Sequence, residues 1–250
     1  MITLGHLDLN ICTHCNNRCV ACSHASPFTK AYHMKASTLE RDLAAIKPFM
    51  FFHRLQLVGG EPLLHPNITD MLYAARLSGV GREVMIITNG KLLPKMSDVF
   101  WGLVQLLQIS VYPGLDPAIL PFAQEQGKKW GFPVYHTVFT DFYLQFSKEP
   151  TDGQESFKNC IWKTDCYTLH EGRFFLCPQS AFFPHQFQRL EAGIDGLPVG
   201  EGLTEGILAD FLQRTSPFNA CKICCGGHGQ TVPWQEPKTK EEWLKLSTVP

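Results

Sequence analysis

Residues 4–24 read LGHLDLNICTHCNNRCVACSH and join a strand pattern to a run of cysteines. Residues 4–11 alternate apolar and polar side chains, which is typical of a β-strand with two different faces. Four cysteines follow at once in one short loop: Cys12, Cys15, Cys19 and Cys22. Neither a packed core nor a disulfide framework needs thiols so crowded, so the loop is first interpreted as a metal or redox site.

The composition is that of an ordinary globular chain. The sequence has 250 residues, of which 44% are hydrophobic and 18% charged, enough for one large domain with a core. The formal net charge of −1 makes nucleic acid and anionic membranes poor partners. No apolar run approaches the roughly 20 residues of a membrane helix, and the first residues do not form a signal peptide. We therefore expect a cytoplasmic protein, where clustered thiols bind metal or act in catalysis.

Strand and helix patterns alternate through the first 140 residues. The expected strands are 4–11, 54–58, 84–88, 108–112 and 133–139, and the expected helices run from about 37 to 50 and over 66–77, 96–106 and 117–130. Such units place parallel strands side by side through right-handed crossovers. Five or six strands are too few for an eightfold barrel, so we expect an α/β fold with a partial TIM-like (β/α) barrel.

The pattern changes after Thr140. Pro, Gly and Cys become frequent, residues 170–173 have the character of a hairpin turn, and 203–214 form one short expected helix. The charged tail from Glu236 is most simply a solvated helix. We therefore expect two domains, a barrel over residues 1–145 and a small Cys-rich region over residues 146–250.

The spacing of Cys15, Cys19 and Cys22 is C-x3-C-x2-C. A structural zinc site has four ligands, whereas three thiolates on a cubane iron–sulfur cluster leave one iron free for a small molecule. Buried thiols, or a zinc loop with Cys12 as the fourth ligand, are the alternatives at this point.

Three motifs at successive strand ends resemble the radical S-adenosylmethionine (SAM) enzymes. They are CNNRCVAC at 15–22, GGEP at 59–62 and ITNG at 87–90, and the resemblance covers about the first 140 residues. It implies a [4Fe–4S] cluster on Cys15, Cys19 and Cys22, with SAM chelating the open iron through its amino and carboxylate groups. It also implies that one electron cleaves SAM to methionine and a 5′-deoxyadenosyl radical, which abstracts a hydrogen from the substrate.

The strand-end residues agree with a SAM site. Gly59 and Gly60 have no Cβ and let the backbone approach a ligand, and Glu61 can pair with an ammonium group. Asn89 and Ser110 are candidates for binding ribose. A strand-ending turn is the alternative interpretation of both Gly59-Gly60 and Asn89-Gly90.

Two positions near the triplet depart from the ligand pattern. The family often has an aromatic residue that contacts adenine just before the third cysteine, but here it is Ala21, so His24 or Phe28 is the expected adenine partner. Cys12 lies outside the triplet and is expected to be a strand-end residue.

A second cysteine group has the layout C-x11-G-x4-C followed later by C-x2-C. It resembles the auxiliary-cluster region called SPASM, in the shortened form called twitch. The resemblance implies one further [4Fe–4S] cluster on four cysteines, with Gly172 turning the hairpin between them: Cys160, Cys177, Cys221 and Cys224. A structural zinc on the same four thiolates is the alternative.

The layout as a whole is similar to small aminocyclitol and sugar dehydrogenases of antibiotic biosynthesis. That resemblance implies removal of a hydrogen from a carbinol carbon, transfer of the hydroxyl proton to a base, and an auxiliary cluster that accepts the second electron. The expected activity is oxidation of an alcohol to a ketone on a small polar substrate, with a flavodoxin or ferredoxin as electron donor.

Other reactions are compatible with the same cofactors. A cysteine beside the substrate radical could donate a hydrogen atom and make the enzyme an epimerase, with Cys225 as the first candidate and Cys166 as the second. Decarboxylation of a sugar acid also fits, as does modification of a peptide, although a first strand so near Met1 leads us to expect no leader-binding domain. The intact triplet and GGEP argue against a non-enzymatic zinc scaffold.

The polar residues near the second cysteine group are candidate substrate contacts. Arg173 is the one advanced as a catalytic residue, and the others are Lys163, His170 and His228.

Overall fold

The chain is described here by a computed structural model that covers residues 1–187, 190–226 and 229–249. One sheet of eight strands has the order β10-β9-β8-β1-β2-β3-β4-β5. Its strands are β1 (Ile2–Cys12), β2 (Met50–Gly59), β3 (Gly81–Thr88), β4 (Leu106–Val111), β5 (Val134–Val138), β8 (Thr168–His170), β9 (Arg173–Phe175) and β10 (Leu197–Pro198). From β8 to β5 the neighbouring strands are parallel, which confirms the expected α/β fold with a partial barrel.

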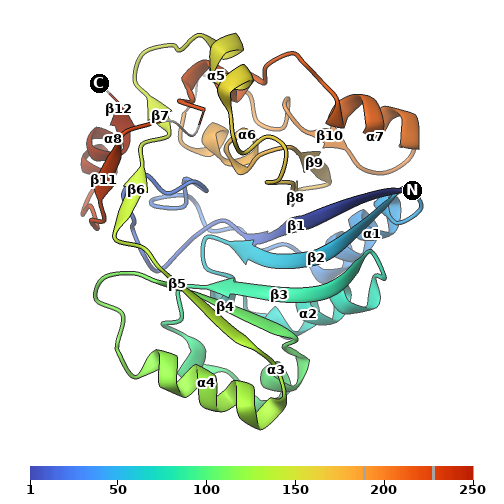
Figure 1. Ribbon diagram of the computed structural model, residues 1–250, viewed down its shortest axis with the longest axis vertical. Coiled ribbons are helices and arrows are strands. Elements are labelled where there is room, and N and C mark those ends of the chain that lie inside the picture. The colour runs from blue at the N-terminus through green and yellow to red at the C-terminus, as the bar shows by residue number, and fades with distance from the viewer. Residues whose placement is uncertain (188–189, 227–228, 250) are drawn as a thin grey trace.

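Four helices connect the parallel strands: α1 (Ala36–Ile46), α2 (Ile68–Leu77), α3 (Asp98–Leu103) and α4 (Ile119–Trp130). Their apolar residues, such as Leu39 and Leu43 of α1, join one large buried cluster with Leu7 and Leu9 of β1. In Figure 1, α3 and α4 lie at the bottom of the view, and the later helices α5 (Gly153–Asn159), α6 (Pro178–Phe182) and α7 (Glu205–Leu212) lie at the top.

Two of the differences between the element boundaries and the pattern-based expectations have the same cause. The first helix ends at Ile46, and Met50 already begins β2, which starts four residues before the expected strand. The helix α3 has only six residues, because Val104 is extended and Leu106 enters β4. In both places the apolar residues that extend a helical pattern belong to a buried strand, a difference that periodicity alone does not resolve.

The expected hairpin after residue 167 is confirmed, and it extends the barrel sheet. Thr168 of β8 pairs with Phe175 of β9 in antiparallel fashion, and Glu171 and Gly172 form the turn with φ of 47° and 71°. On its other side, β8 pairs in parallel with β1, opposite Asp8. Strands from both sides of residue 145 thus share one sheet, and the division into two domains at that position stays a proposal.

The remaining elements are short. They are β6 (Asp141–Tyr143), β7 (Phe146–Ser147), β11 (Thr231–Pro233), α8 (Lys240–Ser247), β12 (Thr248–Val249) and the 3-10 turns η1 (Pro62–Leu64), η2 (Leu93–Lys95), η3 (Phe183–His185) and η4 (Asn219–Ile223). In the described part of the chain, no helix has the length and apolar character needed to span a bilayer.

The expectation of a solvated helix near the C-terminal tail was wrong for one face of α8. Trp243 is fully buried and packs against Phe146, with ring centroids 5.4 Å apart. Its charged neighbours Glu241 and Glu242 stay exposed. Leu244 and Leu246 of the same helix also pack against apolar clusters, so α8 has one apolar face and one charged face.

Candidate functional site

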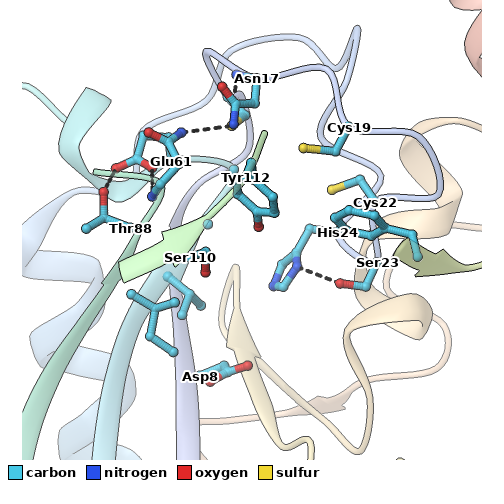
Figure 2. A pocket seen from close by; sticks show the side chains of 17 residues that line it. Asp8, Asn17, Cys19, Cys22, Ser23, His24, Glu61, Thr88, Ser110 and Tyr112 are labelled. Carbon is cyan, nitrogen blue, oxygen red and sulfur yellow. Dashed lines mark hydrogen bonds between the residues drawn. The ribbon is translucent and has the colours of Figure 1, made fainter. Parts of the chain in front are cut away.

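The cysteine loop begins where β1 ends. Cys12, the last residue of β1, is buried, and its Sγ donates a hydrogen bond to the backbone oxygen of Glu61 at 3.1 Å. Cys15, Cys19 and Cys22 line a cavity of about 200 Å³ at the carboxyl ends of the parallel strands, and Figure 2 shows the sulfur atoms of Cys19 and Cys22 directed into it. All three are free thiols. Three sulfur donors beside room for a small molecule fit a cluster with one open iron.

Gly59 and Gly60 support the cysteine loop directly. The Gly60 N–H donates to the Cys12 carbonyl at 2.9 Å, and the next N–H, of Glu61, donates to the His14 carbonyl at 3.0 Å. A Cβ on Gly59 would overlap the Cys12 carbonyl, and one on Gly60 would overlap that of His14. Both glycines line the cavity. The close approach that needs glycine here is therefore that of the loop backbone, whereas the sequence had suggested a ligand.

Glu61 joins the ends of β2 and β3. Its Oε1 accepts a hydrogen bond from Thr88 Oγ1 at 2.6 Å (Figure 2). The same oxygen accepts one from the Leu63 N–H at 3.0 Å, and Oε2 accepts one from the Asn89 N–H at 2.8 Å. Burial raises the pKa of this carboxyl to about 7, against the lowering effect of the three hydrogen bonds. A buried carboxylate on the cavity wall suits an ammonium partner.

Asn89 and Ser110 line the same cavity at the ends of β3 and β4. Asn89 Nδ2 donates to Asn16 Oδ1 at 2.6 Å, so this side chain also ties the cysteine loop to the sheet. Tyr112, two residues beyond Ser110, lines the cavity and stacks on Phe142 with ring centroids 5.9 Å apart. Both rings were missed from the sequence, although Tyr112 follows a strand end already marked by Ser110.

The residues considered for adenine lie in different places. Ala21 is buried with a φ of 52°, and its N–H donates to Ser247 Oγ at 2.9 Å. His24 lines the cavity, whereas Phe28 is absent from the described residues that line it and packs instead with a separate apolar cluster. His24 and the Tyr112–Phe142 pair are therefore the aromatic surfaces available to a nucleobase.

The second cysteine group also comes together in space. Four thiols from separate parts of the chain line one small enclosed cavity: Cys160, Cys177, Cys221 and Cys224. Its other walls are largely apolar and include Phe157, Trp162 and Phe218. Burial raises the pKa of Cys221 to about 11 and that of Cys224 to about 12. Four thiols around a largely apolar cavity fit a metal group, because a bound cation removes the thiol protons that burial otherwise retains.

A third cavity, of about 360 Å³, is called the central cavity here and adjoins both cysteine sites. It shares Asp8, Ser23, His24 and Phe142 with the first cavity. It shares Trp162 and Gln179 with the second. Its other walls come mainly from β6 and the loops beside it, and among the described residues that line it none is Lys or Arg. The three cavities thus form a row, with the two cysteine groups at its ends.

Asp8 was not identified as a site residue from the sequence. Its carboxyl group lies where the first cavity and the central cavity adjoin. Asp8 lies on β1, lines both the first and the central cavity, and its Oδ1 is buried with no hydrogen-bond partner among the described residues. Burial raises its pKa to about 7. The alternation of residues 4–11 had marked it as a polar strand position, but only the barrel shows that this face points inward.

The remaining candidates lie elsewhere. Cys166 lines the central cavity, whereas Cys225 lies outside the described walls of all three cavities and donates its N–H to the Gln145 carbonyl at 3.0 Å. The guanidinium of Arg173 donates to the Gly196 carbonyl at 3.0 Å, and Arg173 lines none of the three cavities either. These positions give no support to a catalytic role for Arg173 or Cys225.

Of the three further polar candidates, two contact backbone carbonyls and the third lies outside the described residues. Lys163 Nζ donates to the Phe157 carbonyl at 2.6 Å beside the second cysteine group. His170 is buried with its Nδ1 3.4 Å from the Asn10 carbonyl. His228 lies outside the described residues.

Comparison with known proteins places these features in a family. Residues 9–116 match the Radical SAM superfamily. The chain is similar to the GTP 3',8-cyclases of Chlorobaculum tepidum (29% identical over 96 residues, 38% of this chain and 29% of the relative) and Geobacter sulfurreducens (31% over 113 residues, 43% and 34%). The match thus spans about a third of the length of these curated relatives.

The fold is similar to that of BtrN in complex with AdoMet and 2-DOIA. The TM-score is 0.58 at 16% identity, and the match covers 90% of this chain and 88% of BtrN. At this identity the likeness concerns the fold alone. Together with the cysteine triplet at the mouth of the partial barrel, the family match leads to one conclusion. The chain carries a radical SAM domain, whose matched part is residues 9–116.

Proposed function

We propose that the protein is a radical SAM oxidoreductase that oxidises an alcohol of a small polar, sugar-like or aminocyclitol-like substrate to a ketone. The observation that carries this proposal is the central cavity, because it adjoins the cysteine triplet on one side and the second cysteine group on the other. A substrate site that adjoins two redox groups suits an oxidation that removes two electrons in separate steps.

The residues that would hold the cofactors line the two outer cavities. A radical SAM domain uses a [4Fe–4S] cluster and SAM, and Cys15, Cys19 and Cys22 would hold that cluster. SAM would lie against five residues of the first cavity: Gly59, Gly60, Glu61, Asn89 and Ser110. An auxiliary [4Fe–4S] cluster would be held by Cys160, Cys177, Cys221 and Cys224. When bound, these groups supply a radical that removes one hydrogen atom and an acceptor for the remaining electron.

The walls of the central cavity favour a neutral or amino-bearing polyol. Asp8 and Asp141 provide carboxylates, Phe139 and Phe142 provide apolar surface for the C–H face of a ring, and no Lys or Arg appears among its described walls. A phosphate or carboxylate placed there would have no cationic partner and would meet like charge. This composition does not favour a nucleoside triphosphate or decarboxylation of a sugar acid.

One observation supports a second candidate function. Cys166 lines the central cavity together with Asp8, and a thiol beside a substrate radical can return a hydrogen atom to it. The reaction would then be epimerisation at the same carbon, redox-neutral for the substrate, and the thiyl radical left on Cys166 would return to the thiol by taking up one electron from the reductant and one proton. In either case we expect a cytoplasmic enzyme that receives its electron from a flavodoxin or ferredoxin.

The test is a substrate panel with the anaerobically reconstituted protein. Neutral, amino-bearing, phosphorylated and carboxylated polyols are incubated with SAM and a reductant, and 5′-deoxyadenosine and ketone are quantified. We expect equal amounts of both products from a neutral or amino-bearing polyol. If the reaction in D₂O gives an epimer that carries one deuterium atom, and the Cys166→Ala variant does not form this epimer, the second function is supported. If SAM is not cleaved in the presence of any of these substrate classes, both proposed functions are rejected.

A further inference from the structure

We propose that Asp8 is the catalytic proton acceptor and that the central cavity is the site where it meets the hydroxyl group of the substrate. This inference rests on the proposed function and deepens it, since nothing in the sequence identified the base.

Unpartnered polar atoms mark the central cavity as a site for a polar ligand. Asp8 Oδ1, His24 Nε2 and Trp162 Nε1 are buried without a hydrogen-bond partner in the described part of the chain. All three residues line the central cavity. Buried polar atoms are nearly always paired in folded proteins, so three unpaired ones on one cavity point to a ligand that pairs with them. A carboxylate and an indole N–H together suit hydroxyl groups, which both donate and accept.

The position of Asp8 suits proton transfer. In Figure 2, Asp8 lies at the end of the pocket opposite Cys19 and Cys22 as seen in this view, with His24 between them. Asp8 is shared by the first and the central cavity, so a substrate carbon facing SAM can present its hydroxyl group to this carboxylate. No Lys or Arg among the described walls of either cavity competes for the carboxylate as an ion-pair partner.

The chemistry balances with Asp8 in this role. The carbinol C–H bond would break with transfer of its hydrogen atom to the 5′-deoxyadenosyl radical, the O–H bond would break with transfer of its proton to Asp8, and a C=O bond would form. The one electron that remains would be passed to the auxiliary iron–sulfur cluster. Burial of Asp8 raises its pKa to about 7, which brings the carboxyl close to the range where a general base works best at neutral pH.

The test compares Asp8→Asn with the wild type under conditions where the wild type forms ketone. Asparagine has the same shape but accepts no proton, so we expect ketone formation to fall at least ~100-fold, as for loss of a general base. SAM cleavage should persist, which raises the ratio of 5′-deoxyadenosine to ketone. The control is Asp165→Asn, because Asp165 is exposed and lies outside the described walls of the cavities, and this variant should behave as the wild type.

A further variant keeps the proposal testable if Asp8→Asn loads no cluster. In Asp8→Ala, added formate should restore ketone formation in proportion to its concentration, while chloride should not. Equal ketone yields from Asp8→Asn and the wild type, or the absence of formate rescue in a loaded Asp8→Ala protein, would overturn the role of Asp8. Absence of ketone from the wild type itself would instead reject the proposed function.

A second, independent set of contacts joins the cysteine loop to residues 230–247. The loop N–H groups of Arg18, Val20 and Ala21 donate to Glu236 Oε1 at 3.3 Å, the Gln235 carbonyl at 3.0 Å and Ser247 Oγ at 2.9 Å. The indole of Trp243 donates to the Cys19 carbonyl at 3.0 Å. This later segment therefore holds the backbone of the loop in place.

One contact of this segment reaches a sulfur atom. Trp234 Nε1 donates to Cys19 Sγ at 3.2 Å. Hydrogen bonds to the sulfur ligands of an iron–sulfur cluster stabilise its reduced, more negative state and raise its potential. We further propose that Trp234 is a positioning residue that sets the reduction potential of the cluster on Cys15, Cys19 and Cys22.

The test is a redox titration followed by EPR, using the signal that changes when SAM is added. In Trp234→Phe the N–H is lost, and we expect the ratio of reduced to oxidised cluster at a fixed potential to fall about tenfold, equivalent to about 59 mV for one electron. Trp234→His retains an N–H donor and should restore much of the shift. Trp130→Phe, at the end of the distant α4, should leave the potential unchanged.

A measurement on the unaltered chain covers the case in which Trp234→Phe loads no iron. With tryptophan labelled by ¹⁵N in the indole ring, pulsed EPR of the reduced cluster should detect a weakly coupled nitrogen that persists in Trp243→Phe, which removes the other indole beside Cys19. Absence of that coupling, or an unchanged potential in a fully loaded Trp234→Phe protein, would overturn the role of Trp234.

Discussion

Replacement of Cys15, Cys19 and Cys22 together by alanine should reduce SAM cleavage to the level of a protein-free control. At the same time, about four irons per chain should remain bound, because the second cysteine group lines its own separate cavity. The thiols of the triplet are the only sulfur donors on the described walls of the first cavity, so their loss leaves SAM no iron to bind. Bound iron, sulfide and zinc are measured after anaerobic reconstitution, and 5′-deoxyadenosine after reduction.

Cys12→Ala is the matched control for this result. It removes a thiol from the same loop, but one that donates to the Glu61 carbonyl and lies outside the described cavity wall. This variant should retain both clusters and SAM cleavage. SAM cleavage that survives in the triple variant would contradict the assignment of the triplet. Zinc in place of the remaining iron would make the second group a structural site and remove its electron-accepting role.

Gly60→Ala should destabilise the chain by about 3 kcal/mol or more. The added methyl group would overlap the carbonyl of His14, and that carbonyl cannot move without losing its hydrogen bond from the Glu61 N–H. The loop that carries Cys15 should therefore be displaced, and the iron of the first cluster should be lost with it. The measurements are anaerobic denaturant unfolding of the apoprotein and iron content after reconstitution.

Gly102→Ala provides the comparison for this substitution. Gly102 lies in α3, and an added Cβ would be 3.5 Å from the ring of Trp130, an ordinary contact distance. This change should leave stability nearly unchanged or raise it slightly, since alanine favours a helix over glycine. Equal stability of the two variants would show that the loop backbone does not need the space at Gly60.

Local pattern was enough to predict much of this fold. The strands from β1 to β5 and their helices were predicted because each element carries its own periodicity, and the turn at Glu171-Gly172 has its own local signal. GGEP and ITNG lie at strand ends, as expected, since GGEP begins on the last residue of β2 and ITNG includes the last two residues of β3.

Long-range packing set the limits of prediction. That β8 lies beside β1 depends on pairing between residues some 160 positions apart, for which no local pattern exists. The inward direction of Asp8 follows from this closure. The buried indole of Trp243 sits in a segment whose charges suggested a solvated helix, since three apolar residues over two turns give too weak a periodic signal.

The contacts between the cysteine loop and residues 230–247 also bear on how the protein is made. Cys19 and its partner Trp234 are 215 positions apart, so the ribosome completes the loop long before it reaches the segment that fixes it. At about 5–20 residues per second, the delay is roughly 10 to 45 seconds. Throughout that interval the loop has its contacts with Glu61 and Asn89, but residues 18–21 lack the contacts that the later segment provides. We therefore expect iron and sulfide to be delivered to the triplet after synthesis of this later segment, so that ribosome-bound chains stalled before residue 230 should carry no cluster there.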